Sequence, residues 1–325
     1  MSDQTTSLPN GSTLAGKTII ITGGNKGLGF EVARQAILLA ASRVIITTRS
    51  EVRGQNAIAA LRENAEIQRV NPNCQIEFFD LDLEDYQSGL RFSQQVKEQV
   101  PELDLLICNG GITLYDYKDT KGGHESNMQV NCYTHFFVVF ELLGLLRATA
   151  ARRGSPTRVT FLGSFNHIRN DLESVPIPPG YKVLDYFDDK ELITPSKRYF
   201  NSKLAIIGLA QKLASLVPPS EVIVNSVCPG IVHTGITSKL SFWLQPFIWV
   251  FLKLKAVPIE TGGRSIIHAA VEVGAESHGK FMPMGGQVVG HTPFLDTDAG
   301  NKFKEQLWSE LLGEGKSVDP DLEPF

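Results

Sequence analysis

Residues 18–29 read Thr-Ile-Ile-Ile-Thr-Gly-Gly-Asn-Lys-Gly-Leu-Gly, and this stretch decides the fold. Residues 18–22 are the β-branched run of a strand, and four glycines come among the next seven residues. A helical pattern of apolar residues then continues from Phe30 to Ile37. Glycines in such a turn let the backbone bend tightly, let a pyrophosphate approach and leave the helix N-terminus open to negative charge. The stretch therefore predicts a strand, a phosphate-binding turn and a helix.

Apolar strand patterns recur along the chain, with helical patterns between them. Nearly continuous apolar runs are expected where helices cover both faces of a parallel sheet. The alternation predicts an α/β fold, a Rossmann-type doubly wound parallel sheet. Strands are expected at residues 18–22, 44–48, 76–79, 103–108, 159–162 and 222–227, and later helices near 260 and at 301–312.

Two stretches interrupt this alternation. Residues 166–197 contain four prolines and predict a surface excursion. An aromatic and apolar patch runs from Phe242 to Val257, after the sixth strand. Neither stretch has a core of its own, and residues 1–16 are polar and are expected to be flexible. We therefore expect one domain over residues 1–325.

The composition excludes several classes of protein. The chain has 325 residues, of which 42% are hydrophobic and 20% charged, and its net charge is −4. It lacks the basic excess that binding to a nucleic acid backbone requires, so no nucleic acid partner is expected. The polar N-terminus does not resemble a signal peptide, which makes the cytoplasm the expected location. The four cysteines and seven histidines show no metal-ligand spacing, so the cysteines are expected to be reduced and no metal site is expected.

The end of the second strand indicates which dinucleotide binds. An acidic residue there would bind the free ribose 2′-hydroxyl of NAD, but this strand ends in Thr47-Thr48-Arg49. The forked cation of Arg49 suits the 2′-phosphate of NADP, and Lys26 in the glycine turn can approach the same phosphate. The sequence thus favours NADP, with the alternative that both cations are merely solvated loop residues.

Two further turns are expected at the same edge of the sheet. Asp80-Leu81-Asp82 follows the third strand and puts a carboxylate where an adenine amine could donate to it, although helix capping is an equal alternative for either aspartate. Cys108-Asn109-Gly110-Gly111 follows the fourth strand and forms either a small-residue turn at the cofactor crevice or an ordinary strand-end turn.

Tyr199 and Lys203 are four residues apart in a segment with a strong helical pattern, so their side chains share one helix face. An unperturbed phenol has a pKa of about 10 and exchanges protons poorly at neutral pH without a cation beside it. Lys203 would be that cation, assisted by oxidised nicotinamide. The pair predicts Tyr199 as the acid/base of a hydride transfer.

Taken together, these residues resemble the short-chain dehydrogenase/reductase family, and more closely its retinol-dehydrogenase-like branch. The similarity spans most of the chain. Its matching positions are the turn at 22–29, Asp82-Leu83, Asn109-Gly110-Gly111, Asn131, Ser164, Tyr199-x-x-x-Lys203 and Pro229-Gly230-Ile231-Val232-His233-Thr234.

The resemblance implies a catalytic set of Ser164, Tyr199, Lys203 and Asn131. Ser164 would hydrogen-bond the substrate oxygen, and Tyr199 would give it a proton during reduction or take one during oxidation. Lys203 would lower the tyrosine pKa and hold the nicotinamide ribose, while Asn131 would position a water for proton relay. Val232 and Thr234 would contact the nicotinamide carboxamide and the pyrophosphate. The full set of expected cofactor-binding residues is Gly23, Lys26, Gly27, Leu28, Gly29, Arg49, Asp82, Asn109, Asn131, Tyr199, Lys203, Val232 and Thr234.

The aromatic patch falls where this family usually has its substrate lid, here residues 236–257. A large apolar wall favours a bulky hydrophobic substrate, such as a terpenoid, steroid, retinoid or polyketide of secondary metabolism. NADP(H) enzymes usually run as reductases, so the expected function is that of a ketoreductase. Oxidation of a hydrophobic secondary alcohol and a catalytically idle NADP-binding sensor or scaffold are the alternatives. Residues 242–252 could instead contact a membrane surface or another chain, and both monomer and homodimer remain open.

Overall fold

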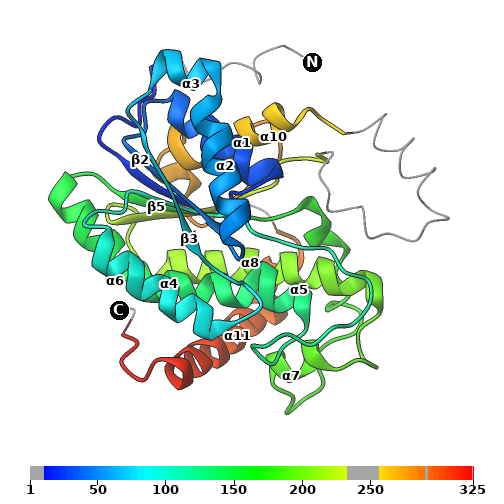
Figure 1. Ribbon diagram of the computed structural model, residues 1–325. Coiled ribbons are helices and arrows are strands. Elements are labelled where there is room, and N and C mark those ends of the chain that lie inside the picture. Colours follow the sequence, from blue (N-terminus) through cyan, green and yellow to red (C-terminus); the bar gives the residue numbers. More distant parts are fainter. Residues whose placement is uncertain (1–10, 233–255, 290–291, 324) are drawn as a thin grey trace.

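The computed structural model describes residues 11–232, 256–289, 292–323 and 325, and its centre is a parallel sheet (Figure 1). Within the described residues this sheet has seven strands in the order β3-β2-β1-β4-β5-β6-β7, and every neighbouring pair is parallel. The predicted α/β doubly wound fold is confirmed. The strands are β1 Thr18–Ile21, β2 Arg43–Thr48, β3 Gln75–Asp80, β4 Leu105–Cys108, β5 Thr157–Leu162, β6 Val222–Val227 and β7 Phe281–Met282.

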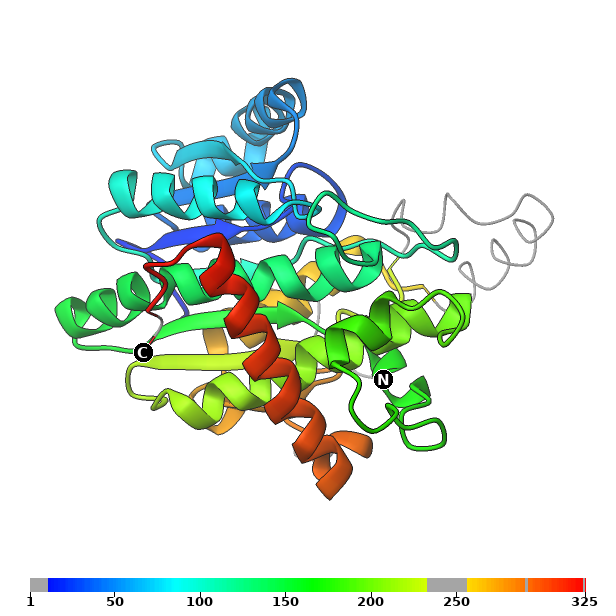
Figure 2. The same cartoon turned by 90° about the horizontal axis from the view of Figure 1, so that it is seen from below.

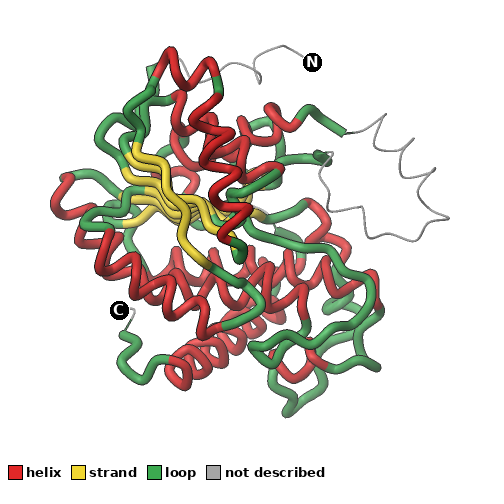
Figure 3. The backbone as a smooth tube through the Cα atoms, viewed as in Figure 1, coloured by secondary structure: helices red, strands yellow, loops and turns green. Residues whose placement is uncertain are grey.

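Both faces of the sheet are buried, because alternate side chains of each strand enter two different cores. In β1, Ile19 and Ile21 join one core and Ile20 joins the other, and all three are fully buried. The helices of the first face are α1 Gly27–Leu38, α2 Glu51–Glu63, α3 Ala65–Val70 and α10 Ile259–Ile267. Those of the second face are α4 Tyr86–Gln99, α6 Thr134–Arg153 and α8 Pro195–Leu216. Figure 3 shows the strands lying between these two helical layers.

A further helix, α11 (Asp298–Val318), lies across the outer side of the second layer. It packs on α8, α4 and α6, and Figure 2 shows it crossing that layer. Its buried side chains Phe303, Leu307 and Leu311 recur every four residues and form one apolar face. The helix is longer than the predicted 301–312. It starts earlier because Thr297 caps its N-terminus by accepting a hydrogen bond from Gly300 N–H, and it continues to Val318.

Residues 166–197 are more closely tied to the core than the sequence suggested. They include α7 (Val183–Asp188), and their last three residues form the first turn of α8. Glu310 of α11 accepts hydrogen bonds from Val183 N–H and Leu184 N–H, both 3.0 Å, and so holds the first turn of α7. The apolar side chains that this stretch sends into the core are Leu172, Val183, Leu184, Tyr186, Phe187 and Ile193.

Helix α6 continues a short helix, α5 (Ser126–Met128), and a π-helical turn, η1 (Gln129–Tyr133). Within the described part of the chain, Ser126–Arg153 alone is long and apolar enough to cross a membrane, but 72% of its most apolar window is buried inside the fold. It is the central helix of the second layer. The four cysteines are free and buried, in line with the prediction that they are reduced core residues.

Candidate active site

The carboxyl ends of β1 and β4 lie side by side in the middle of the sheet. β1 pairs with β2 on one side and with β4 on the other, so the chain order reverses between β1 and β4. In open α/β sheets such a switch point leaves a crevice in which ligands bind. The glycine turn follows β1 and the turn at Asn109 follows β4, and the two turns meet at this switch point, where a Cβ on Gly23 would lie 3.0 Å from Gly110 Cα.

The glycine turn is shaped by backbone conformation and by close approach. Gly23 and Gly27 have φ values of 64° and 57°, which favour glycine. A Cβ on Gly29 would lie 2.5 Å from Asn109 Nδ2 and 2.6 Å from the Gly23 carbonyl oxygen. Helix α1 begins directly after Lys26, and no described side chain caps it. Its first N–H groups are therefore available to an anion such as a phosphate.

A buried set of hydrogen bonds joins the two turns. Asn109 Nδ2 donates to the Thr22 carbonyl oxygen (2.8 Å), and Gly110 N–H donates to Thr22 Oγ1 (2.9 Å). His135 Nε2 lies 2.9 Å from the same hydroxyl. Burial lowers the pKa of His135 to about 3, and the positive charge of Lys203 is a second, smaller cause of this shift. The histidine is therefore uncharged at neutral pH. This role of His135 could not be predicted from the sequence, because the residue belongs to no motif and lies in a largely apolar helix.

Helix α8 carries Tyr199 and Lys203 to the carboxyl ends of β4 and β5. The Lys203 ammonium is buried, donates to the Leu162 carbonyl oxygen (2.8 Å) and lies 5.8 Å from the centre of the Tyr199 ring. Burial lowers the pKa of Lys203 to about 8, although the neighbouring thiols of Cys132 and Cys228 oppose this shift. Lys203 is therefore charged at neutral pH and loses its proton more readily than an ordinary lysine.

The hydroxyls of Ser164 and Thr113 lie close enough to the Tyr199 hydroxyl to affect its pKa. Burial raises the pKa of Tyr199 above its ordinary value, and the hydrogen bonds from Ser164 and Thr113 lower it in part. Ser164 is separated from the end of β5 by Gly163 alone; its backbone is extended, and its hydroxyl accepts from Asn166 N–H (3.2 Å). The long stretch between Ser164 and Tyr199 therefore leaves the two side chains together.

Asn131 lies in the π-helical turn η1 and is fully buried. Its side-chain amide accepts from Ile112 N–H (2.8 Å) and donates to the Ile112 carbonyl oxygen (2.9 Å). Nδ2 also donates to Ser202 Oγ (3.0 Å), which in turn donates to the Tyr199 carbonyl oxygen (2.8 Å). Asn131 thus joins the loop after β4 to helix α8, while its part in a water relay stays a prediction.

The charged residues expected at the adenosine end lie at neighbouring strand ends. The exposed Arg49 follows β2, and its Nη1 is 3.1 Å from Glu84 Oε1 and 3.7 Å from Asp82 Oδ1. Burial raises the pKa of the Glu84 carboxyl, but Lys118 and Arg49 outweigh this effect and hold it below its ordinary value. Glu84 belongs to no motif, so its place beside Arg49 could not be predicted from the sequence. Lys26 is exposed at the start of α1.

Val232 lies near the glycine turn, because both contact Gly262 of helix α10. A Cβ on Gly262 would lie 2.6 Å from Val232 Cγ2 and 3.2 Å from Leu28 Cδ1, so these two predicted residues are near neighbours. Val232 also forms a parallel bridge with Val257. Thr234 and residues 236–255 of the predicted lid lie outside the described residues.

A family model described as short chain dehydrogenase matches residues 17–164 and 194–245. The chain belongs to this family. It is therefore a member of a family of oxidoreductases that bind a nicotinamide cofactor.

Individual short chain dehydrogenases are similar over most of the chain. Short chain dehydrogenase sor7 from Hypocrea jecorina is 46% identical over 84% of this chain and 76% of its own length. Short chain dehydrogenase macD from Penicillium terrestre is 38% identical, with 94% and 93% covered. A crystal structure of an uncharacterized protein from Mycobacterium Paratuberculosis has the same fold, with a TM-score of 0.65, 23% identity, and 94% and 95% of the two chains covered.

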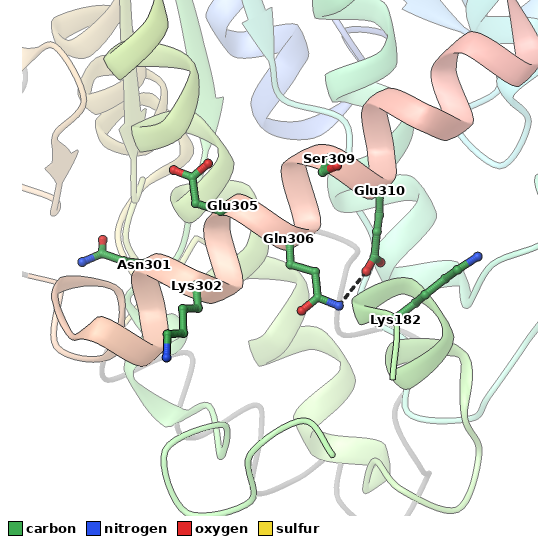
Figure 4. Close-up of a pocket in the computed structure, with 7 residues that line it drawn as sticks. All are labelled: Lys182, Asn301, Lys302, Glu305, Gln306, Ser309 and Glu310. Atoms are coloured by element: carbon green, nitrogen blue, oxygen red, sulfur yellow. Dashed lines mark hydrogen bonds between the residues drawn. The ribbon is translucent and has the colours of Figure 1, made fainter. Parts of the chain in front are cut away.

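A surface hollow of about 660 Å³ lies along α11 (Figure 4). It is lined by Lys182, Asn301, Lys302, Glu305, Gln306, Ser309 and Glu310. Gln306 donates to Glu310 Oε1 (2.8 Å), as the figure shows. None of these residues belongs to the predicted site, and we assign the hollow no part in the chemistry.

His124 connects three elements on the second face of this short chain dehydrogenase. Its Nδ1 is 2.6 Å from Asp188 Oδ2 at the end of α7, and its Nε2 is 2.8 Å from Glu314 Oε2 in α11. Burial opposes a charge on this ring, but the two carboxylates outweigh burial and raise the pKa of His124 to about 9. No group of residues that could hold a metal ion occurs in the described part of the chain.

The raised pKa of His124 predicts a pH-dependent stability. An unfolded histidine has a pKa of about 6.5, so the stabilisation by the protonated ring is complete below that pH and is lost as pH rises towards about 9. We expect His124→Gln to reduce the free energy of unfolding by about 2–3 kcal/mol at pH ~6 and by much less at pH ~9.5. Urea unfolding of both proteins over this range measures the difference. A difference that stays constant with pH would contradict the assignment.

Proposed function

We propose that this chain is an NADP(H)-dependent oxidoreductase that reduces the carbonyl of a bulky hydrophobic substrate, with Tyr199 as the proton donor. The observation that carries the proposal is the position of Tyr199 beside the buried ammonium of Lys203, which lies 5.8 Å from the ring centre, with the Ser164 hydroxyl acting on the phenol. These groups lie next to the crevice at the carboxyl ends of β1 and β4. The buried free cysteines fit a reducing compartment and support the cytoplasm as its location.

The residues present fit a nicotinamide dinucleotide. The uncapped start of α1 suits a pyrophosphate, and a Cβ on Gly23 would lie 3.0 Å from Gly110 Cα, across the crevice. Bound NADPH would supply the hydride to the carbonyl carbon. The Ser164 hydroxyl would donate a hydrogen bond to the carbonyl oxygen, and Tyr199 would give that oxygen its proton as negative charge develops on it. The positive charge of Lys203 favours the phenolate that Tyr199 then becomes.

Apolar side chains around this site support a hydrophobic substrate. Six of them are between 37% and 57% exposed, and they follow β4, β5, β6 and β7 at the edge where Tyr199 lies. Exposed apolar groups beside a reacting centre favour a bulky apolar ligand, such as a terpenoid, steroid, retinoid or polyketide ketone. The six are Tyr115, Phe165, Ile168, Ile231, Met284 and Val288.

Turnover of a panel of hydrophobic ketones tests the proposal. The purified protein is mixed with NADPH or NADH and each ketone, and the loss of nicotinamide absorbance is followed. The reverse reaction is measured with secondary alcohols and NADP⁺, since oxidation would use the same residues in the opposite direction. We expect NADPH-dependent reduction. Binding of NADPH without turnover of any ketone or alcohol would instead support the idle sensor or scaffold.

The choice of NADP over NAD is tested at Arg49. Because its guanidinium is exposed and is held only at the surface by Glu84 and Asp82, it can turn to a 2′-phosphate. We expect Arg49→Ala to lower kcat/KM for NADPH by about 10–100-fold and to leave kcat/KM for NADH almost unchanged. Arg62→Ala removes the same charge at the far end of α2 and should change neither value. An equal loss with both cofactors would contradict the assignment.

A further inference from the structure

The segment after β4 is held by two asparagines that lie one helical turn apart. The amide of Asn131 pairs with both backbone groups of Ile112, at 2.8 and 2.9 Å. Asn127 does the same for Leu114: it accepts from Leu114 N–H (2.9 Å) and donates to the Leu114 carbonyl oxygen (3.0 Å). The two amides therefore clamp alternate residues and leave Thr113 between them.

This clamp is rigid because both asparagines are buried and anchored elsewhere. Neither side chain is exposed to solvent. Asn127 Nδ2 also donates to Glu125 Oε1 (2.8 Å), and Asn131 Nδ2 donates to Ser202 Oγ (3.0 Å) on α8. Removing either buried amide would leave its partners without hydrogen bonds, so both amides are held in these positions.

The clamp also fixes the position of Thr113. The residues on both sides of Thr113 are bonded through their N–H and carbonyl groups, so the backbone is held in place before and after Thr113. The loop that carries Thr113 lies against α8, since a Cβ on Gly111 would lie 3.8 Å from Lys203 Nζ. A side-chain hydrogen bond from Thr113, like the one from Ser164, acts on the Tyr199 phenol and lowers its pKa in part. Hydroxyls from the loop after β4 and from the loop after β5 therefore both reach the phenol.

We propose that Thr113 is a further catalytic residue, whose hydroxyl donates a hydrogen bond to the Tyr199 oxygen when the phenol has passed its proton to the substrate. This inference rests on the proposed function. During reduction a bound reduced nicotinamide would supply the hydride that forms the new C–H bond, and the C=O π pair would move onto the oxygen. That oxygen would take the proton of Tyr199, whose O–H bond breaks as a new O–H bond forms on the substrate. The electron pair stays on the Tyr199 oxygen, where a hydroxyl donor stabilises the negative charge. Asn127 is a positioning residue, because together with Asn131 it holds Thr113 in this position.

Thr113→Val and Thr113→Ser form a matched pair of variants. Valine keeps the shape of threonine but loses the donor, whereas serine keeps the donor. Oxidation of a secondary alcohol needs Tyr199 as the phenolate. In this reaction we expect Thr113→Val to shift the acidic limb of the pH profile of kcat/KM to higher pH by about one unit. We also expect kcat at neutral pH to fall about tenfold. Thr113→Ser should follow the original profile. Thr120→Val is the control, because the Thr120 hydroxyl bonds to the His124 carbonyl oxygen of the same loop (2.9 Å).

A second measurement needs no turnover. Tyrosinate absorbance is measured from pH ~8 to pH ~11, with NADP⁺ bound, for the protein and for Tyr199→Phe. The difference between the two curves gives the pKa of Tyr199. Thr113→Val should raise the pKa of Tyr199, and Asn127→Ala should raise it by less. Asn127→Ala still tests the inference if Thr113→Val does not fold. If no substrate is turned over, the proposed function fails but the titration still decides the role of Thr113. An unchanged titration and an unchanged pH profile in Thr113→Val would overturn the inference.

Discussion

Tyr199→Phe is expected to lower kcat for ketone reduction by about 10³-fold or more. The variant removes only the phenol oxygen, which is the atom on which Ser164 and Thr113 act and the one that gives its proton to the substrate. The ring remains, so its packing against Phe200 and the approach of Lys203 to its face are preserved. Steady-state kinetics with NADPH measure the loss. Nicotinamide binding, measured by fluorescence titration, should change by less than about threefold.

Tyr181→Phe is the matched control for this experiment. It removes the same atom from a tyrosine that is 43% exposed and lies outside the site. We expect its kcat and thermal unfolding temperature to equal those of the original protein. If Tyr199→Phe kept more than about a tenth of kcat, the phenol would not be the proton donor, and another group would have to protonate the substrate oxygen.

The second large effect is expected at Gly29. In Gly29→Ala the new Cβ would lie 2.5 Å from Asn109 Nδ2 and 2.6 Å from the Gly23 carbonyl oxygen, both of which form the crevice. The glycine turn and the Asn109 turn must then move apart. Because the pyrophosphate is bound by this turn in the proposed function, we expect the Kd for NADPH to rise about 100-fold or more. Fluorescence titration with NADPH measures the change.

Gly144→Ala controls for the added methyl group. Gly144 is exposed in α6, and nothing lies within 4 Å of the position of its Cβ. Alanine favours a helix over glycine by about 0.5–1 kcal/mol, so this variant should be slightly more stable and should bind NADPH as before. Unchanged NADPH binding in Gly29→Ala would show that the pyrophosphate does not lie on this turn.

The amino-acid sequence predicted those parts of the protein that depend on residues near one another in the chain. The strands, the glycine turn and the helix after it follow from apolar periodicity and from backbone angles that only glycine adopts readily. The spacing of Tyr199 and Lys203 placed both on one face of α8, because a helix turns once in about 3.6 residues. Pairing of parallel strands then brought Asn109 and Ser164 to the same edge of the sheet.

Only the tertiary structure decided contacts between residues that are distant in sequence. Asn127 and Thr113 belong to no predicted motif, and their role depends on how the loop after β4 lies on helix α5. His124 and Glu314 are 190 residues apart and meet because α11 folds back over the second layer. The periodicity of apolar residues predicts which face of a helix or strand is buried, but it does not predict which other helix or strand covers that face. A pKa shift, an ion pair or a hydrogen bond between elements depends on that partner, and therefore on the packing of the whole chain.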